Sequence, residues 1–346
     1  MSMGWHDHAA SLTDLIFRAT TQALGEANVD IAQVDSVVLS AHDLVDGRSL
    51  SSMVTAPAAG AYLRDEIRLA EDGLAAMSLA SARIEAGETE FSIVAAWGRA
   101  SEGNYLHTSR FATDPFLVQP FSVNEFEISS LRLSAWIGEH GDQVAARLRA
   151  QTARCQRAAR NPRAISAVAR PAVSYPMMPS EAPRFADIVV VAVIGAEKSA
   201  VRIAGVGHST EVANIGERGL SRMHALQDAV HRARAADGSF SARLDVVELA
   251  GPCLTDEAIA VEAIKMAAAG EGFDAYASLH CVNPSGGSER GWCFPASGLL
   301  NLSECYLQLV GKAAGVQVSG APSRALATGL SPMGGQVAHA VILATA

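Results

Sequence analysis

The chain has 346 residues, of which 49% are hydrophobic, and a formal net charge of −9. A chain of this size can bury a large core, and its acidity argues against general affinity for nucleic acid. It contains no apolar run of about 18 residues, no signal-peptide pattern at its N-terminus and no CxxC pair among its five cysteines. We therefore expect a cytoplasmic α/β protein without a membrane span, a disulfide framework or a metal centre.

The predicted elements begin with an alanine-rich helix and a buried strand, and this pair occurs twice. Leu12–Ala27 is followed by the strand Asp35–His42, and Met223–Ala236 is followed by the strand Asp245–Pro252. In each case a helix, a short polar turn, an aspartate and an apolar run come in the same order. The repetition predicts a duplicated α/β unit.

Each half also has a helix that begins at a Gly-Leu pair. Leu74–Glu85 follows Gly73, and Leu299–Val310 follows Gly298, with apolar residues at helical spacing. After the first of these helices comes the apolar strand Phe91–Trp97. The chain therefore divides into an N-terminal half (1–103), a less regular region (104–183) and a C-terminal half (184–346).

The region between the halves is rich in proline and basic residues. Its arginines are Arg147, Arg149, Arg154, Arg157, Arg160, Arg163 and Arg170. They are typical of a solvated face paired with surface acids, which is the interpretation we favour. The alternative is a site for an anion such as the phosphates of coenzyme A.

The segment from Ala70 to Ala76, together with the strand Phe91–Trp97, resembles the nucleophile region of the thiolase superfamily. In that family a cysteine stands three residues before the glycine, at a helix N-terminus that favours its thiolate. Here that position is Ala70. Alanine has no nucleophilic atom, so the resemblance predicts a thiolase-like protein that forms no acyl-enzyme.

Further motifs follow in the family's order and are most similar to the sterol-carrier-protein type of thiolase. They are Phe185–Val193, Val247–Thr255, the Asn-Pro-Ser-Gly-Gly string ending at Gly287, Gly291–Gly298, and Gly334-Gly335-Gln336. The resemblance implies a five-layered α/β/α/β/α fold made of two duplicated halves. It also implies that the helices beginning at Gly73 and Gly298 lie back to back in the middle layer.

The resemblance assigns the family's other chemical positions to Ala250, Trp292 and Ser331, where that family has two histidines and, in some members, a cysteine. Claisen chemistry needs a nucleophile, a base and an enolate stabiliser, and none of the usual providers is present. We expect the indole of Trp292 to fill part of the former cavity, between Ala70 and Ser331.

Several other residues are candidates for a site. His280, Cys281 and Cys293 could form a displaced nucleophile and base, although buried structural roles are commoner for such residues. Asn283, Gly286 and Gly287 belong to the loop that the resemblance implies for ligand binding. Glu71 and Asp72 could supply a carboxylate base, or could cap the helix that follows them. The histidines lack the spacing of a metal site.

The resemblance also bears on assembly. Thiolases begin with a strand, whereas Met1–Trp5 looks too short for a strand and a turn, so the first sheet is expected to be trimmed or completed by another chain. A homodimer is expected, with Phe91–Trp97 pairing with its twin at the dimer edge.

These observations leave three functions open. The first, which we favour, is an acyl-CoA-handling subunit without ordinary thiolase chemistry, auxiliary to an intact thiolase or another partner; coenzyme A thioesters would be ligands, and no cofactor would be bound covalently. The second is a carbon–carbon lyase acting on a β-hydroxyacyl-CoA by retro-aldol cleavage, with a zinc-ribbon and OB-fold partner, or an acyltransferase of altered mechanism. The third is a structural protein without a ligand.

Overall fold

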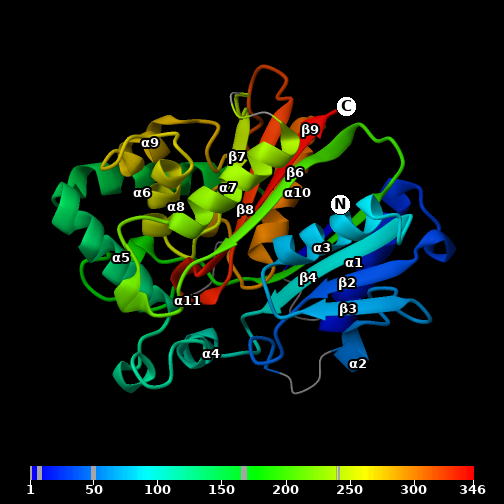
Figure 1. Ribbon diagram of the computed structural model, residues 1–346, viewed down its shortest axis with the longest axis horizontal. Helices are drawn as coiled ribbons and strands as arrows, with labels where there is room; N and C mark the ends of the chain where they lie inside the picture. The colour runs from blue at the N-terminus through cyan, green and yellow to red at the C-terminus, as the bar shows by residue number, and fades with distance from the viewer. Residues whose placement is uncertain (1, 6–9, 48–51, 165–169, 239, 241) are drawn as a thin grey trace.

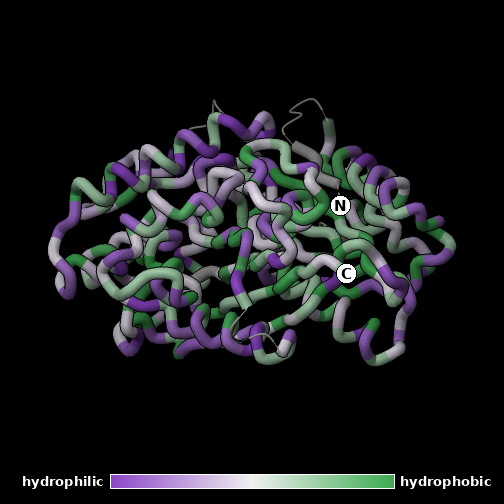
Figure 2. The backbone as a smooth tube through the Cα atoms, turned by 90° about the horizontal axis from the view of Figure 1, so that it is seen from above, coloured by the Kyte–Doolittle hydropathy of each residue, from purple (hydrophilic) through white to green (hydrophobic). Residues whose placement is uncertain are grey.

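The computed structural model describes residues 2–5, 10–47, 52–164, 170–238, 240 and 242–346. Within these residues the chain forms two β-sheets with helices packed on their faces (Figure 1). Hydrophobic segments concentrate in the interior, and hydrophilic ones follow the outer helices and loops (Figure 2). In the part of the chain described here, no helix is long and apolar enough to cross a membrane.

The elements alternate as the sequence predicts. The strands are β1 (Ser2–Trp5), β2 (Ser36–Ser40), β3 (Asp65–Leu69), β4 (Phe91–Arg99), β5 (Asp187–Gly195), β6 (Val201–Thr210), β7 (Val246–Glu248), β8 (Arg324–Leu330) and β9 (Val337–Thr345). The helices are α1 (Leu12–Ala27), α2 (Ser52–Thr55), α3 (Gly73–Glu85), α4 (Tyr105–Phe111), α5 (Glu125–His140), α6 (Val144–Ala159), α7 (His224–Asp237), α8 (Leu254–Ala263), α9 (Gly272–Ser278), α10 (Ser297–Leu309) and α11 (Pro332–Gly335).

The two sheets and the helices between and outside them form five layers. The first sheet has the strand order β1-β5-β4-β2-β3 and the second the order β6-β9-β8-β7. Helix α1 packs on β5 and β4, and α7 packs on β6 and β9, so they form the outer layers. Helices α3 and α10 contact each other and both sheets in between (Figure 1). The predicted five-layered fold with two similar halves is confirmed.

Glycine allows the two middle helices to approach closely where they begin. A Cβ atom on Gly73 would lie 2.6 Å from the Cβ of Leu299, which is closer than packed carbon atoms come. A Cβ on Gly298 would collide with the Asp72 carboxylate. The Gly-Leu pairs found in the sequence therefore mark the contact between the two halves.

The first sheet is complete at its N-terminal side, so the prediction of a missing strand is wrong. Strand β1 pairs antiparallel with β5, with Ser2 opposite Val191 and Trp5 opposite Ile188. Because β5 already supplies a template, four residues are enough to form this edge strand, and no other chain is needed there.

The first sheet takes strands from both sides of the predicted boundary at 183/184. Strand β5 pairs antiparallel with β4 along its whole length, from Phe91 opposite Gly195 to Arg99 opposite Asp187. The change from the first sheet to the second therefore follows β5. The region 104–183 is also more regular than expected, because it contains α4, α5 and α6.

Strand β4 is not an edge strand, so the predicted pairing of Phe91–Trp97 with a twin is wrong. It lies between β5 and β2, and Ile93–Trp97 is buried. Its apolar residues on both faces reflect burial between helical layers rather than an interface between subunits. Within the described chain, the free edge on this side of the sheet belongs to β3.

Three of the seven arginines of the cluster, Arg147, Arg154 and Arg157, are buried, which corrects the prediction of a solvated face for these three; Arg149 and Arg160 are exposed. Arg147 pairs with Glu181 at 2.7 Å, with both side chains buried. Arg154 donates to Ser288 Oγ, and Arg157 donates to the carbonyl oxygens of Tyr276 and Val282. These guanidinium groups satisfy buried acceptors and hold α6 against the second half.

Candidate functional site

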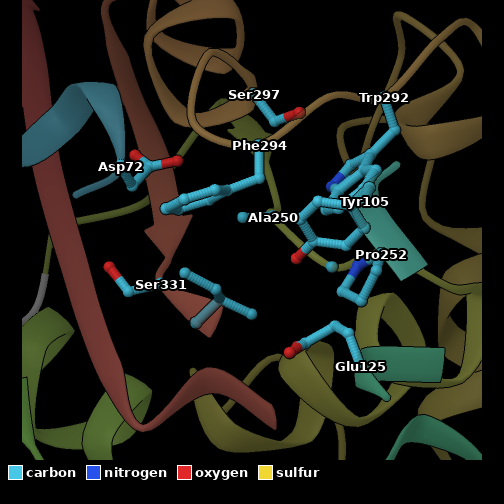
Figure 3. Close-up of a pocket in the computed structure, with 11 residues that line it drawn as sticks. Asp72, Tyr105, Glu125, Ala250, Pro252, Trp292, Phe294, Ser297 and Ser331 are labelled. Carbon is cyan, nitrogen blue, oxygen red and sulfur yellow. The ribbon is translucent and has the colours of Figure 1, made fainter. Parts of the chain in front are cut away.

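A small cavity lies where the two halves meet the α4–α5 region. Its wall is made of Asp72, Tyr105, Glu125, Ala250, Gly251, Pro252, Trp292, Phe294, Ser297, Leu330 and Ser331 (Figure 3). The free volume is about 10 Å³, which is about the space of one water molecule. In this conformation the cavity is far too small for an acyl thioester.

Three of the four positions assigned by the family resemblance lie on this wall. They are Ala250, Trp292 and Ser331. Ala70 is exposed and does not line the cavity. The indole therefore occupies the cavity wall as expected, but the space does not extend to Ala70. The catalytic meaning of these four positions stays a prediction.

Asp72 joins the two middle helices at the edge of the cavity. Its Oδ1 accepts from the backbone N–H of Leu74 at 2.9 Å and caps α3, while Oδ2 accepts from the N–H of Gly298 in α10 at 3.0 Å. Burial raises the pKa of Asp72 to about 7, although both N–H donors act to lower it. The capping role weighed for Asp72 in the sequence is therefore present.

Two other carboxylates border the site and already have partners. Ser331 Oγ donates a hydrogen bond to Glu71 Oε2. Both oxygens of Glu125 accept from the N–H of Gly334, at 3.1 and 3.2 Å. Ser331 thus has a carboxylate beside it, but the Gly334 N–H that could face an oxyanion is already bound by Glu125. This arrangement is poorly suited to a serine nucleophile.

An aromatic cluster closes the cavity and includes a residue that the sequence did not single out. The ring of Tyr105 lies 5.0 Å from Trp292, 6.1 Å from Phe126 and 6.3 Å from Phe294, measured between centroids. Burial raises the pKa of Tyr105 well above its ordinary value, with the charge of Glu125 acting in the same direction. Asn104 caps α4 and so fixes the start of this helix at Tyr105. No motif in the sequence marks this tyrosine.

The alternative nucleophiles lie outside the cavity. His280 is exposed, and Cys281 is half-buried near the surface. Cys293 is buried with its Sγ 3.4 Å from the carbonyl oxygen of Phe294, and burial raises the pKa of both thiols. A thiolate is the reactive form of cysteine, so these environments disfavour attack on a thioester. Among the residues described, no group of three or more His, Cys, Asp and Glu side chains is placed to hold a metal ion.

The Asn-Pro-Ser-Gly-Gly loop is tightly packed, and its residues do not line the cavity. Asn283 Oδ1 accepts from the N–H of Leu249 at 2.6 Å, and a Cβ on Gly286 would lie 2.6 Å from Ala158 Cα. A Cβ on Gly287 would lie 2.5 Å from a carboxylate oxygen of Glu257. Close packing therefore accounts for an asparagine and two glycines at these positions. That they bind a ligand stays a prediction.

Comparisons with known proteins place this arrangement among solved structures. No family model and no curated protein matches the sequence. The fold is similar to that of the Ltp2-ChsH2(DUF35) aldolase, at 15% identity and a TM-score of 0.79, covering 99% of this chain and 96% of that one. It is also similar to a monomeric SCP2-thiolase like protein type 1 from Mycobacterium smegmatis, at 16% identity and a TM-score of 0.73, covering 100% of this chain and 76% of that one.

The chain has an SCP2-thiolase-like fold. At these identities the likeness establishes the architecture alone, and what the neighbours catalyse or bind is a separate question.

Proposed function

We propose that this chain is a thiolase-like subunit that handles acyl-CoA within a complex and performs no ordinary thiolase chemistry. The observation that carries the proposal is the closed cavity: Trp292, Tyr105 and Phe294 fill it, and Ala70 stands outside. None of the described side chains on its wall is a thiol or an imidazole. Without an activated nucleophile, an acyl group has nothing to bind to covalently.

Binding measurements on a variant at position 292 test this proposal. Histidine is smaller than tryptophan, so Trp292→His opens the cavity, and we expect it to bind acetyl-CoA markedly more tightly than the wild type. Phe185→Leu is the matched control, because Phe185 packs 6.0 Å from Trp292 but does not line the cavity. Unchanged binding by Trp292→His in calorimetry would show that the indole does not block the thioester.

Retro-aldol cleavage is the second candidate. Cleavage of a β-hydroxyacyl thioester needs a base for the hydroxyl proton and a hydrogen-bond donor for the enolate oxygen, but no nucleophile. The cavity offers the Glu125 carboxylate and the Tyr105 phenol together, and the fold is similar to that of an aldolase complex. Release of an aldehyde or ketone from 3-hydroxyacyl-CoA by the chain with its partner would favour this candidate over the auxiliary role.

A complex is part of both candidates. The similar aldolase is described as a pair of Ltp2 with a DUF35 protein, so a small protein of that kind, or an intact thiolase, is a natural partner to test. Co-purification from cells producing this chain with the products of neighbouring genes would identify it.

Strand β3, one of the outermost strands of the two sheets, is suited to pairing with a second copy of itself. Antiparallel pairing of two copies of β3 about Ile67 would place Glu66 opposite Arg68 of the second copy, so the strand is complementary in charge to itself. The apolar side chains of Tyr62 and Leu63, which are 72% and 87% exposed just before β3, lie at the same edge. We therefore propose that any homodimer forms there. One structural neighbour is described as monomeric. The mass of this chain in solution, measured by light scattering, therefore tests whether it forms a dimer.

A further inference from the structure

Two histidines that are far apart in the sequence lie next to each other on strands β6 and β9 of the second sheet. His208 is directly opposite His339 in the antiparallel pairing, and the centroids of their rings are 6.4 Å apart, with the ring planes 27° from parallel. Residues directly opposite each other on paired strands point to the same face of a sheet. The two imidazoles are therefore neighbours, which their spacing in the sequence does not reveal.

The backbone around the pair shows which face of the sheet the histidines occupy. Gly207 faces α7, because a Cβ on it would collide with the backbone of that helix, so the next residue, His208, points to the opposite face. Gly329, which is opposite His339 on β8, faces Asp72 at the start of α3. Both histidines thus point toward the middle layer. Because β6 is the outermost strand (Figure 1), His208 is exposed, whereas His339, one strand further in, is only 6% exposed.

The ring of His339 makes no hydrogen bond to any described residue, although both of its nitrogens are buried. A buried polar group without a partner is costly, so we expect something other than the protein to bind there. Burial lowers the pKa of His339 to about 4, and the nearby His208 acts in the same direction. At neutral pH the ring is therefore uncharged and one of its nitrogens carries a lone pair, which is the form that binds metal ions.

The surroundings of the pair favour an ion over a water molecule alone. Val206, Val337 and Val341 lie two residues from the histidines on the same face, and their side chains offer no hydrogen bonds to a buried water molecule. A zinc–nitrogen bond is about 2.0–2.1 Å long, so two imidazole rings on one tetrahedral ion have centroids about 5 Å apart. The ring of His208 is exposed, and rotation of this side chain shortens the present distance and turns its lone pair toward His339. Water molecules on the exposed side would complete the coordination.

We propose that His208 and His339 bind one divalent transition-metal ion, such as Zn²⁺, and that this ion ties the outer strand β6 to β9. Imidazole nitrogen suits Zn²⁺, Cu²⁺ and Ni²⁺, whereas Mg²⁺ prefers oxygen ligands. Neither histidine lines the cavity between the two halves, and the inference is independent of the proposed handling of acyl-CoA.

Calorimetric titration of the full chain with Zn²⁺ tests this site. We expect His208→Ala to weaken binding of one Zn²⁺ by about tenfold or more, since even a residue that only orients a metal ligand typically contributes that factor. Because His208 is exposed, alanine at this position leaves the core packing unchanged. His231→Ala is the matched control, because His231 is exposed on α7, which packs on the same two strands. This control should bind Zn²⁺ as the wild type does, and Mg²⁺ should bind to none of these proteins at this site.

Thermal unfolding gives a second measurement. An ion that binds only the folded protein stabilises it, so Zn²⁺ should raise the unfolding temperature of the wild type and of His231→Ala but not that of His208→Ala or His339→Leu. The inference is overturned if the wild type binds no Zn²⁺, or if His208→Ala and His339→Leu both bind it as tightly as the wild type. In either case the pair holds a water molecule at most. Circular dichroism of each variant shows whether it is folded.

Discussion

Replacing Asp72 by asparagine probes the contact between the two halves of the molecule. The Asp72 carboxylate is 1% exposed and accepts one N–H at the start of α3 and one at the start of α10. Asparagine keeps the shape but has one acceptor oxygen and a donor NH₂, so one of the two N–H groups loses its partner. Burial raises the pKa of Asp72 from 3.8 to about 7, which gives the substitution a pH dependence.

The direction in which stability changes with pH depends on whether the folded or the unfolded protein binds the proton more tightly. Between about pH 4 and pH 7 the folded protein keeps a proton on Asp72 that the unfolded chain releases, so the free energy of unfolding falls as the pH rises. From pH 5 to pH 8 this amounts to about 3 kcal/mol. Asparagine does not titrate. The stability of the wild type relative to Asp72→Asn should therefore fall by that amount over this range.

Urea unfolding of both proteins at pH 5 and pH 8 measures the effect. Ser297→Ala is the control, because Ser297 precedes Gly298 as Asp72 precedes Gly73 but carries no titratable group. Its effect should be the same at both pH values. The reasoning would be refuted if the free energy of unfolding of the wild type, relative to that of Asp72→Asn, increased with pH. That result would mean that hydrogen bonds from the two N–H groups stabilise the charged carboxylate by more than its burial costs.

Three further predictions concern packing, pH and assembly. Gly73→Ala should destabilise the fold by about 1–3 kcal/mol, because the added methyl group overpacks the contact with Leu299. At Gly138 a Cβ meets nothing within 4 Å, so Gly138→Ala should stabilise the fold by up to about 1 kcal/mol. Thermal unfolding of both variants measures the difference. Burial lowers the pKa of His339 to about 4, so the wild type should lose up to about 3 kcal/mol as the pH falls from 6.5 to 4, and urea unfolding of His339→Leu should lack this loss. Arg68→Glu should weaken a β3-paired dimer in light scattering and the double swap with Glu66→Arg should restore it, whereas a dimer indifferent to both would pair elsewhere.

The sequence predicts the architecture well because the spacing of apolar residues indicates the helices and strands, and the glycines indicate where two helices pack closely. The helix predicted over Leu12–Ala27 is α1 itself, and the two Gly-Leu pairs mark the back-to-back helices. What fails is the order of strands within the first sheet. An apolar run such as Phe91–Arg99 is equally consistent with a central strand and with an interface strand, and only the pairing of β4 with β5 and β2 distinguishes them.

The candidate site is less accessible to sequence reasoning. Ala250, Trp292 and Ser331 are found by the family resemblance, since they stand in recognisable motifs. Tyr105 and Glu125 come from the region without such motifs, and long-range packing alone brings them to the cavity. A run of arginines predicts a solvated face, whereas Arg154 and Arg157 are buried. Their acceptors are mostly backbone carbonyls, which no residue pattern reveals.

Native mass spectrometry with acetyl-CoA tests the central claim, that the chain handles an acyl thioester without forming an acyl-enzyme. We expect a complex whose mass increases by that of the whole thioester and which disappears completely when the same sample is denatured, because Cys281 and Cys293 are held as thiols and Ala70 has no nucleophile. An acetyl group that survives denaturation, or the absence of any complex, would contradict the claim.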